Sequence, residues 1–213
     1  NAWGISLSVQ QFFETPTIAG LAQRVRQLSV KTPVVEPDVI DLRREICLDE
    51  QISPPTAWRV EQIAAPAAIL LTGATGFFGA FLLHELLMQT DARIYCLARS
   101  ADSADGLARI RANAARYFLW HEYAAPRVIP VCGDLAAPRL GLADERFDEL
   151  ADAVDVIYHN GALVNFAYPY AALKPANVLG TAEILRLACQ NRTKPVQYVS
   201  TVSVFDKGGC DPE

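Results

Sequence analysis

Mostly apolar runs alternate with amphipathic stretches over most of the chain. The runs have the length of buried strands and lie at 68–71, 92–98, 127–132, 154–158 and 196–200. Between them, apolar residues recur at helical spacing over 77–87, 103–117, 144–151 and 170–190. This alternation predicts a parallel sheet covered on both faces, which is a doubly wound α/β fold. A ligand of such a sheet binds at the carboxyl ends of the strands, so the residues after each run are the site candidates.

A glycine-rich turn joins the first run to the first helical stretch. In such a turn the first glycine makes the bend, the second lets a pyrophosphate approach the backbone, and the third lets the helix pack near the strand. The helix N-terminus also offers unpaired N–H groups and a positive dipole end. The pattern predicts a Rossmann-like dinucleotide site. The expected contacts are Gly73, Thr75, Gly76, Phe77, Phe78 and Gly79.

The helical stretch after this turn is rich in phenylalanine. Phe77, Phe78 and Phe81 recur at helical spacing with the leucines that follow, and His84 and Glu85 fall on the other side. This spacing predicts that the phenylalanine rings lie in the core.

The residue after the second run bears on which dinucleotide would bind. A site selective for NAD has an acidic residue about 20 residues beyond the glycine turn, where it holds the ribose hydroxyls. This chain has Arg99 there, and Arg109 lies near the start of the next helical stretch. A guanidinium can form two hydrogen bonds with the 2′-phosphate of NADPH. The arginines therefore indicate NADPH; a solvated side chain at a strand end is the alternative for each.

The third and fourth runs add further candidates for contact with a cofactor. Asp134 and Leu135 follow the third run and can place a carboxylate and an apolar side chain against an adenine edge. Asn160, Gly161 and Ala162 follow the fourth run. Small residues are expected where the backbone runs beside a cofactor.

Three more polar residues lie near the predicted edge. His159 directly follows the fourth run and is expected to be a hydrogen-bonded structural histidine rather than an acid or base. Asn177 lies in a helical stretch, where a buried amide needs a partner, so we expect it to be bonded near the site. Ser200 is the last residue of the fifth run and is a further candidate for cofactor contact.

The N-terminal part has a pattern of its own. Residues 18–28 have apolar positions at helical spacing, with Thr15 as the expected N-cap and Pro16 at the first helical position. Residues 31–37 have the composition of a linker. A short charged helix is expected over 41–53, before two prolines.

Composition and charge exclude several classes of protein. The chain has 213 residues, of which 51% are hydrophobic and 20% charged, as in globular proteins. A net charge of −5 argues against a nucleic-acid or anionic-membrane surface. No apolar run approaches the roughly 20 residues of a membrane span, and the start lacks a signal pattern, so a cytoplasmic protein is expected. The scattered cysteines include no C-x-x-C pair, and no metal site is predicted.

The motifs in order resemble an extended short-chain dehydrogenase/reductase. More narrowly, they resemble the thioester reductase domain that ends some nonribosomal peptide and polyketide synthetases. Residues 1–30 resemble the C-terminal end of an acyl or peptidyl carrier protein. The motifs are Thr72-Gly73-x-x-Gly76-x-x-Gly79, Arg99, Gly133-Asp134-Leu135, His159-Asn160-Gly161-Ala162, Asn177-Val178-x-Gly180-Thr181 and Ser200-Thr201.

The resemblance implies reductive release of a carrier-bound chain. An acyl or peptidyl thioester on the phosphopantetheine of a carrier protein would take a hydride from NADPH and leave as an aldehyde or alcohol. Other synthetase modules would lie in cis. By this match Thr201 would hydrogen-bond the thioester carbonyl, with a tyrosine and a lysine completing the catalytic set.

The family's tyrosine and lysine follow the fifth strand, which this chain passes only at its end. A Tyr-x-x-x-Lys sequence does occur from Tyr170 to Lys174, but it precedes the fifth run. We interpret it as helix surface or support. Residues 38–213 are therefore expected to be the NADP-binding part of a reductase, without its C-terminal substrate-binding part and without turnover of its own.

Two other functions are compatible with the pattern. A nucleotide-sugar epimerase or dehydratase would share the fold and Thr201, but would not explain the carrier-like start or Arg99. A noncatalytic nucleotide-binding module that docks on a carrier protein is the other alternative.

Overall fold

The computed structural model describes residues 17–29, 45 and 47–201. Contacts divide the described residues into two units. The first holds those up to Leu48 together with Val164–Lys174. The second holds Asp49–Leu163 and the described residues from Pro175 onward.

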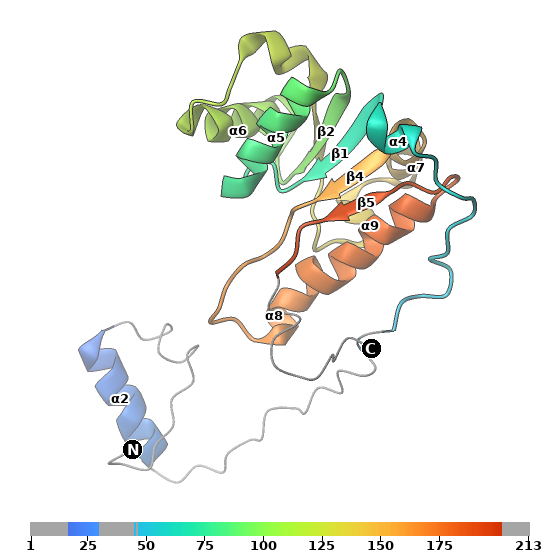
Figure 1. Cartoon of the computed structure of the whole chain (residues 1–213). Helices are drawn as coiled ribbons and strands as arrows, with labels where there is room; N and C mark the ends of the chain where they lie inside the picture. Colours follow the sequence, from blue (N-terminus) through green and yellow to red (C-terminus); the bar gives the residue numbers. More distant parts are fainter. Residues whose placement is uncertain (1–16, 30–44, 46, 202–213) are drawn as a thin grey trace, which may run out of the picture. The chain divides into compact units, whose positions relative to one another are not determined.

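The second unit is built on a sheet of five parallel strands in the order β3-β2-β1-β4-β5 (Figure 1). Thr72, the last residue of β1, lies beside Leu97 on one side and His159 on the other. The chain leaves β1 toward β2 and later returns to β4, so the topological switch point lies between the carboxyl ends of β1 and β4. The predicted α/β doubly wound fold is confirmed. The strands are β1 (Ala68–Thr72), β2 (Arg93–Ala98), β3 (Val128–Cys132), β4 (Val156–His159) and β5 (Val196–Tyr198).

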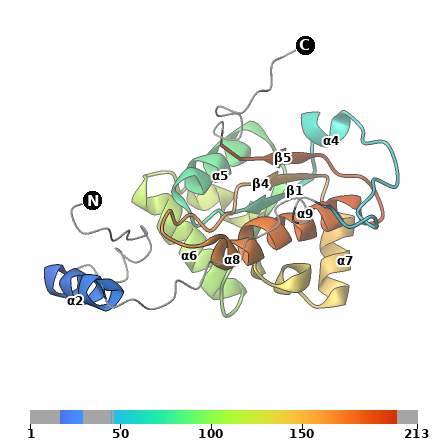
Figure 2. The ribbon, with the colours of Figure 1, turned by 90° about the horizontal axis from the view of Figure 1, so that it is seen from below.

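Helices cover both faces of this sheet. The helices α5 (Phe77–Gln89) and α6 (Ser103–Arg116) lie next to each other, as do α7 (Asp144–Ala153) and α9 (Gly180–Cys189) (Figures 1 and 2). Shorter helical segments are α4 (Glu61–Ala64), η1 (Glu122–Arg127) and η2 (Pro138–Gly141).

Two buried clusters lie on opposite faces of the sheet. Ile69 and Leu71 of β1 pack with Leu83 of α5, whereas Leu70 packs with Phe147 of α7. Successive side chains of a strand point to opposite faces, so one uncharged strand supplies both clusters. This is why the first apolar run carries no polar alternation.

The predicted helix over 170–190 is divided into three segments. They are α8 (Tyr170–Lys174), a π-helical segment η3 (Pro175–Leu179) and α9. Pro175 has no N–H and therefore cannot continue the α-helical hydrogen bonding from α8. The expectation of one continuous helix was wrong at this point, and the wider π turn contains Asn177.

The segments before the sheet differ from expectation in their bounds. Helix α2 (Ile18–Ser29) begins after Thr17, whose hydroxyl oxygen accepts the Gly20 N–H at 3.1 Å. The expected cap Thr15 lies outside the described residues, as does the linker at 31–37. The helix expected over 41–53 does not reach its predicted end, because residues 47–49 have no regular structure and the Asp49 carboxylate accepts the Gln51 N–H at 3.0 Å in a turn. Helices in the described ranges lack the length and apolar character that a membrane crossing requires.

Candidate functional site

The glycine turn between β1 and α5 has the geometry that its spacing predicts. Gly73 has a φ of +75°, a conformation that favours glycine. A side chain at Gly79 would clash with the carbonyl oxygen of Gly73, so this glycine lets α5 pack directly on the turn. The helix begins after Gly76, which has no side chain to cap the first N–H groups. These N–H groups are available to an anion at the carboxyl end of β1. Thr75 lies exposed on the same turn.

A residue that the sequence analysis missed supports this turn. Asn113 of α6 donates from Nδ2 to the carbonyl oxygens of Ala74 at 3.0 Å and Gly76 at 2.9 Å. The signal in the sequence was an asparagine between alanines in the middle of a helical stretch. Its role depends on α6 lying beside the turn, which periodicity does not predict.

The loop after β4 lies against the glycine turn. The hydroxyl oxygen of Thr72 accepts the N–H of Asn160 at 3.1 Å and of Gly161 at 2.7 Å. A Cβ on Gly73 would lie 2.9 Å from the Cα of Gly161, so the two backbones touch. Ala162 follows in the same loop. The structure therefore brings the predicted residues of the first and fourth strand ends together at the switch point.

The residues after β3 reach the same loop. A Cβ on Gly161 would lie 2.6 Å from Cδ1 of Leu135, so the Leu135 side chain packs against this glycine. Asp134 is bonded within its own turn, where its carboxylate accepts the Ala136 N–H at 2.9 Å. Leu135 is thus part of the switch-point arrangement, while the described contacts of Asp134 are local.

His159 and Asn177 are both hydrogen-bonded, as the sequence indicated. Burial lowers the pKa of His159 to about 4, and both ring nitrogens lie within hydrogen-bond distance of threonine hydroxyls. The side chain of Asn177 accepts the N–H of Leu163 at 2.7 Å and donates to its carbonyl at 3.0 Å. The neutral ring and its two partners make His159 a structural residue.

Arg99 and Arg109 lie together beyond the end of β2. Both are exposed, and a guanidinium nitrogen of Arg109 donates to the backbone carbonyl of Arg99. This bond holds Arg109, from α6, at the strand end that carries Arg99. The positive charge of Arg109 therefore lies at the carboxyl edge of the sheet, beside the backbone of Arg99.

The phenylalanines of α5 do not lie in the core, so that prediction was wrong. Phe77, Phe78 and Phe81 are 67%, 51% and 38% exposed. The buried face of α5 consists of smaller residues and leucines, including Ala80 and Leu83. Because α5 is apolar on nearly every side, its periodicity does not select the buried face. Phe77 and Phe78 open the helix at the glycine turn, where they can contact a ligand.

Ser200 and Thr201 lie just past the end of β5. The strand ends at Tyr198, two residues earlier than predicted, and Val199 donates its N–H to the carbonyl of His159 at 3.0 Å. This bond holds the chain beside the end of β4. The structure therefore places the exposed Ser200 and Thr201 at the same edge of the sheet as Asn160.

The Tyr-x-x-x-Lys sequence of α8 has a different set of partners. The Tyr170 hydroxyl donates to the Glu45 carboxylate at 2.8 Å, and the Lys174 ammonium pairs with it at 2.7 Å. Hydrogen bonds from Lys174 and Tyr170 lower the pKa of Glu45. These side chains hold α8 to the chain near residue 45 within the first unit, in keeping with a supporting role.

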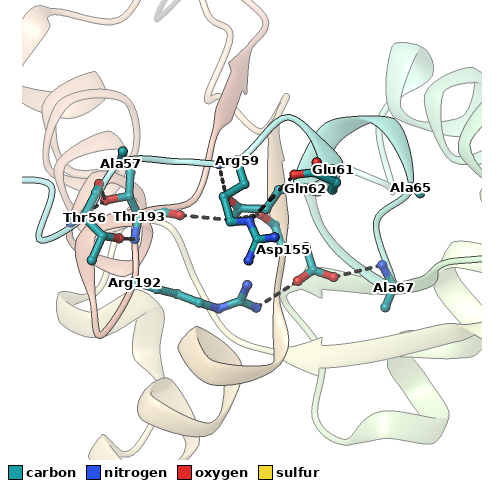
Figure 3. Close-up of a pocket in the computed structure, with 10 residues that line it drawn as sticks. All are labelled: Thr56, Ala57, Arg59, Glu61, Gln62, Ala65, Ala67, Asp155, Arg192 and Thr193. Carbon is teal, nitrogen blue, oxygen red and sulfur yellow. Dashed lines mark hydrogen bonds and ion pairs between the residues drawn. The ribbon is translucent and has the colours of Figure 1, made fainter.

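A cavity of about 410 Å³ lies at the other end of the sheet, beside the amino ends of β1 and β4 (Figure 3). Its polar groups already bond to one another. The Asp155 carboxylate accepts the Ala67 N–H at 2.8 Å and pairs with Arg192 at 2.9 Å, and Gln62 donates to the Thr193 carbonyl at 3.0 Å. These bonds hold the segment before β1 against the sheet. No His, Cys, Asp and Glu cluster suited to a metal ion occurs in the described part of the chain.

Comparison with known proteins identifies the family. Residues 71–210 match the family of NAD-binding domains described as male sterility protein. The chain belongs to this family. The NAD-binding domain is 52% identical to a component of the linear gramicidin synthase of Brevibacillus parabrevis over 204 residues, which are 94% of this chain and 4% of that protein. It is 41% identical to glycine betaine reductase of Emericella nidulans over 214 residues, which are 97% of this chain and 17% of that protein.

A solved structure supports the same family assignment. The terminal R domain from the myxalamid PKS-NRPS biosynthetic pathway superposes with a TM-score of 0.73 at 54% identity, covering 76% of this chain and 42% of that one. The predicted resemblance to the reductase domains of nonribosomal peptide synthetases is confirmed. The chain spans less than half the length of each of these relatives.

The residues at the switch point fit the dinucleotide that the family name implies. A Cβ at Gly76 would lie 3.3 Å from the Gly73 carbonyl oxygen, so the turn is tight at this glycine. The glycines, the uncapped start of α5 and the two arginines are the donor set that phosphates require.

Proposed function

We propose that this NAD-binding domain serves an NADPH-dependent thioester reductase, which releases an acyl or peptidyl chain from a carrier protein as an aldehyde or alcohol. The observation that carries the proposal is the junction of the Gly73 turn with the Asn160-Gly161 loop at the switch point, with Thr201 at the same edge. The reductase relatives and the synthetase context of their names support the reaction class.

Each group of residues has a distinct task in this proposal. The Gly73–Gly79 turn binds the pyrophosphate through backbone N–H groups, and Arg99 and Arg109 pair with the 2′-phosphate. NADPH supplies the hydride when bound. Thr201 donates its hydroxyl proton in a hydrogen bond to the thioester carbonyl oxygen, where negative charge develops during reduction. The remaining proposed cofactor contacts are Thr75, Phe77, Phe78, Leu135, Asp134, Asn160, Ala162, Asn177 and Ser200.

The proposal includes the surroundings of the domain. Its partner is a phosphopantetheinyl carrier protein, whose C-terminal end we assign to residues 1–30, joined through a linker at 31–37. Other synthetase modules lie in cis, in the cytoplasm. The gramicidin synthase relative is far longer than this chain, and its name supports this arrangement.

The test uses the full natural polypeptide that contains these residues, supplied with NADPH and an acyl-pantetheine thioester. We expect NADPH oxidation in step with release of free thiol and aldehyde. Thr201→Val is expected to lower kcat by about 100-fold, as loss of one oxyanion donor does, with little change in NADPH affinity. Thr193→Val, the same change at the opposite end of the sheet, serves as the control. NADPH binding without oxidation by any thioester would favour a noncatalytic module instead.

A further inference from the structure

A chain of hydrogen-bonded side chains connects β1 to the helix that follows the π turn. The Thr72 hydroxyl lies 2.8 Å from Nδ1 of His159, and Nε2 of the same ring lies 3.1 Å from the Thr181 hydroxyl. Thr181 in turn donates to the carbonyl oxygen of Asn177 at 2.7 Å. Thr72 and His159 are 0% and 1% exposed. Thr72, His159 and Thr181 therefore form a continuous series of hydrogen bonds that ends at the Asn177 carbonyl. We call this series the relay.

The direction of every hydrogen bond in this relay follows from its two ends. At one end, the N–H groups of Asn160 and Gly161 both donate to the Thr72 oxygen, so the Thr72 proton must point elsewhere and reaches Nδ1 of His159. Nδ1 therefore carries no proton, and a neutral ring carries it on Nε2. At the other end, the Asn177 carbonyl can only accept, so the Thr181 oxygen is left to accept from Nε2.

The relay fixes the contact on which the cofactor site is built. With its proton committed to His159, the Thr72 oxygen presents both lone pairs to the loop after β4. Those two bonds hold Gly161 against Gly73. If the ring had no acceptor at Nε2, the other tautomer would compete, and a proton on Nδ1 would leave the Thr72 hydroxyl without an acceptor.

We propose that His159 and Thr181 are positioning residues for the dinucleotide. Thr181 selects the Nε2–H tautomer of His159, the tautomer orients the Thr72 hydroxyl, and the hydroxyl holds the Asn160-Gly161 loop beside the Gly73 turn. This assignment rests on the dinucleotide site of the proposed function. Thr181 lies in α9 and does not touch the glycine turn. It acts on the turn through two hydrogen-bonded side chains, those of His159 and Thr72.

Conservative variants of Thr181 test the proposal. Thr181→Val keeps the shape but removes the hydroxyl, and it is expected to weaken binding of both NADPH and NADH about tenfold, the size of one lost buried hydrogen bond. Thr181→Ser restores the hydroxyl and is expected to bind both as the wild type does. Thr193→Val is the matched control, because its hydroxyl bonds to Thr56 at the opposite end of the sheet.

Nitrogen NMR of the imidazole rings gives a readout that simple packing would not change. In the wild type at neutral pH, the His159 resonances should show a proton on Nε2 only, and in Thr181→Val a mixture of tautomers. A proton on Nδ1 of the wild type would overturn the relay, even if Thr181→Val failed to fold. If the wild type binds dinucleotide and Thr181→Val binds it equally well, the positioning role is refuted and the proposed function stands. If the wild type binds neither NADPH nor NADH, the proposed function fails with it.

Discussion

At the residue scale, we propose that Arg99, just beyond the end of β2, sets which dinucleotide is preferred. Arg109 is held at Arg99 by a bond to its backbone carbonyl, which leaves the Arg99 side chain exposed at the strand end. In this proposal a guanidinium in that place would add a charge-assisted contact with the 2′-phosphate, which NADH lacks. Selectivity is therefore expected to depend mainly on one side chain.

The first prediction concerns Arg99→Ala. The variant should lose about 1.5–3 kcal/mol of NADPH binding, which is about 10- to 150-fold in Kd, while NADH binding stays unchanged. Fluorescence titration with both dinucleotides measures this. Arg93→Ala, which removes an exposed arginine from the amino end of the same strand, is the control. Equal losses for both dinucleotides would contradict the assignment of Arg99.

Single residues also show where sequence reasoning succeeded and failed. Asn160 and Gly161 were predictable because parallel strands bring their carboxyl ends to one edge. The phenylalanines of α5 were misplaced because an apolar helix has no contrast between its faces. Asn113 was missed because its two bonds reach from a different helix to the glycine turn.

At the element scale, a single lysine caps the C-terminal end of helix α9. Lys194 is 2% exposed, and its ammonium donates to the carbonyl oxygens of Leu187 at 3.2 Å, Gln190 at 2.7 Å and Arg192 at 2.9 Å. The last carbonyls of a helix lack partners within it, and the dipole there favours a cation. Lys194, which lies between α9 and β5, supplies both the missing donors and the positive charge.

Replacing this lysine should therefore destabilise the fold. Lys194→Met is expected to lower the free energy of unfolding by about 2–3 kcal/mol, because buried carbonyls lose a charged donor. Denaturant titration monitored by circular dichroism measures the change. Lys174→Met is the matched control, since its ion pair with Glu45 lies near solvent and should contribute much less to stability. Equal effects of the two substitutions would show that Lys194 is not a structural cap.

Element bounds were predictable to within a few residues, and the exceptions have local causes. The fourth strand was expected from 154 but begins at Val156. Val154 donates its N–H to Leu150 at the end of α7, and Asp155 faces the segment before β1. The π segment was not expected because apolar spacing alone does not distinguish a continuous helix from one interrupted at Pro175.

At the scale of the whole molecule, the buried histidine couples stability to pH. Burial lowers the pKa of His159 from 6.5 to about 4, so between these values the unfolded chain binds more protons than the native one. The contribution of His159 to the free energy of unfolding is therefore largest above about pH 6.5. It falls by about 3 kcal/mol in total as the pH drops toward 4.

Unfolding free energies at about pH 7 and about pH 4.5 test this coupling. His159→Gln has no ring to protonate, so its stability should fall less over the same interval than that of the wild type. Urea titrations at the two pH values give both slopes. If wild type and variant lose equal stability, other groups are responsible for the acid sensitivity.

The parallel, doubly wound sheet was predictable from the alternation of the chain, but long-range contacts outside the sheet were not. Thr56 and Thr193 bond to each other beside the cavity at the amino ends of the strands, although they lie far apart in sequence. Neither residue belongs to a pattern that marks such a contact. Interactions of this kind depend on the completed fold.

The bonds between Asn177 and Leu163 have a consequence for how this domain can vary. The chain leaves the second unit after Leu163 and returns at Pro175, and the Asn177 side chain binds both the N–H and the carbonyl of Leu163. The two ends of the excursion are thus fastened by one amide. Doubling the length of the segment between them would cost only about 0.6 kcal/mol of closure entropy. We therefore expect the domain to tolerate a longer segment between Leu163 and Pro175 while the strand ends keep their spacing.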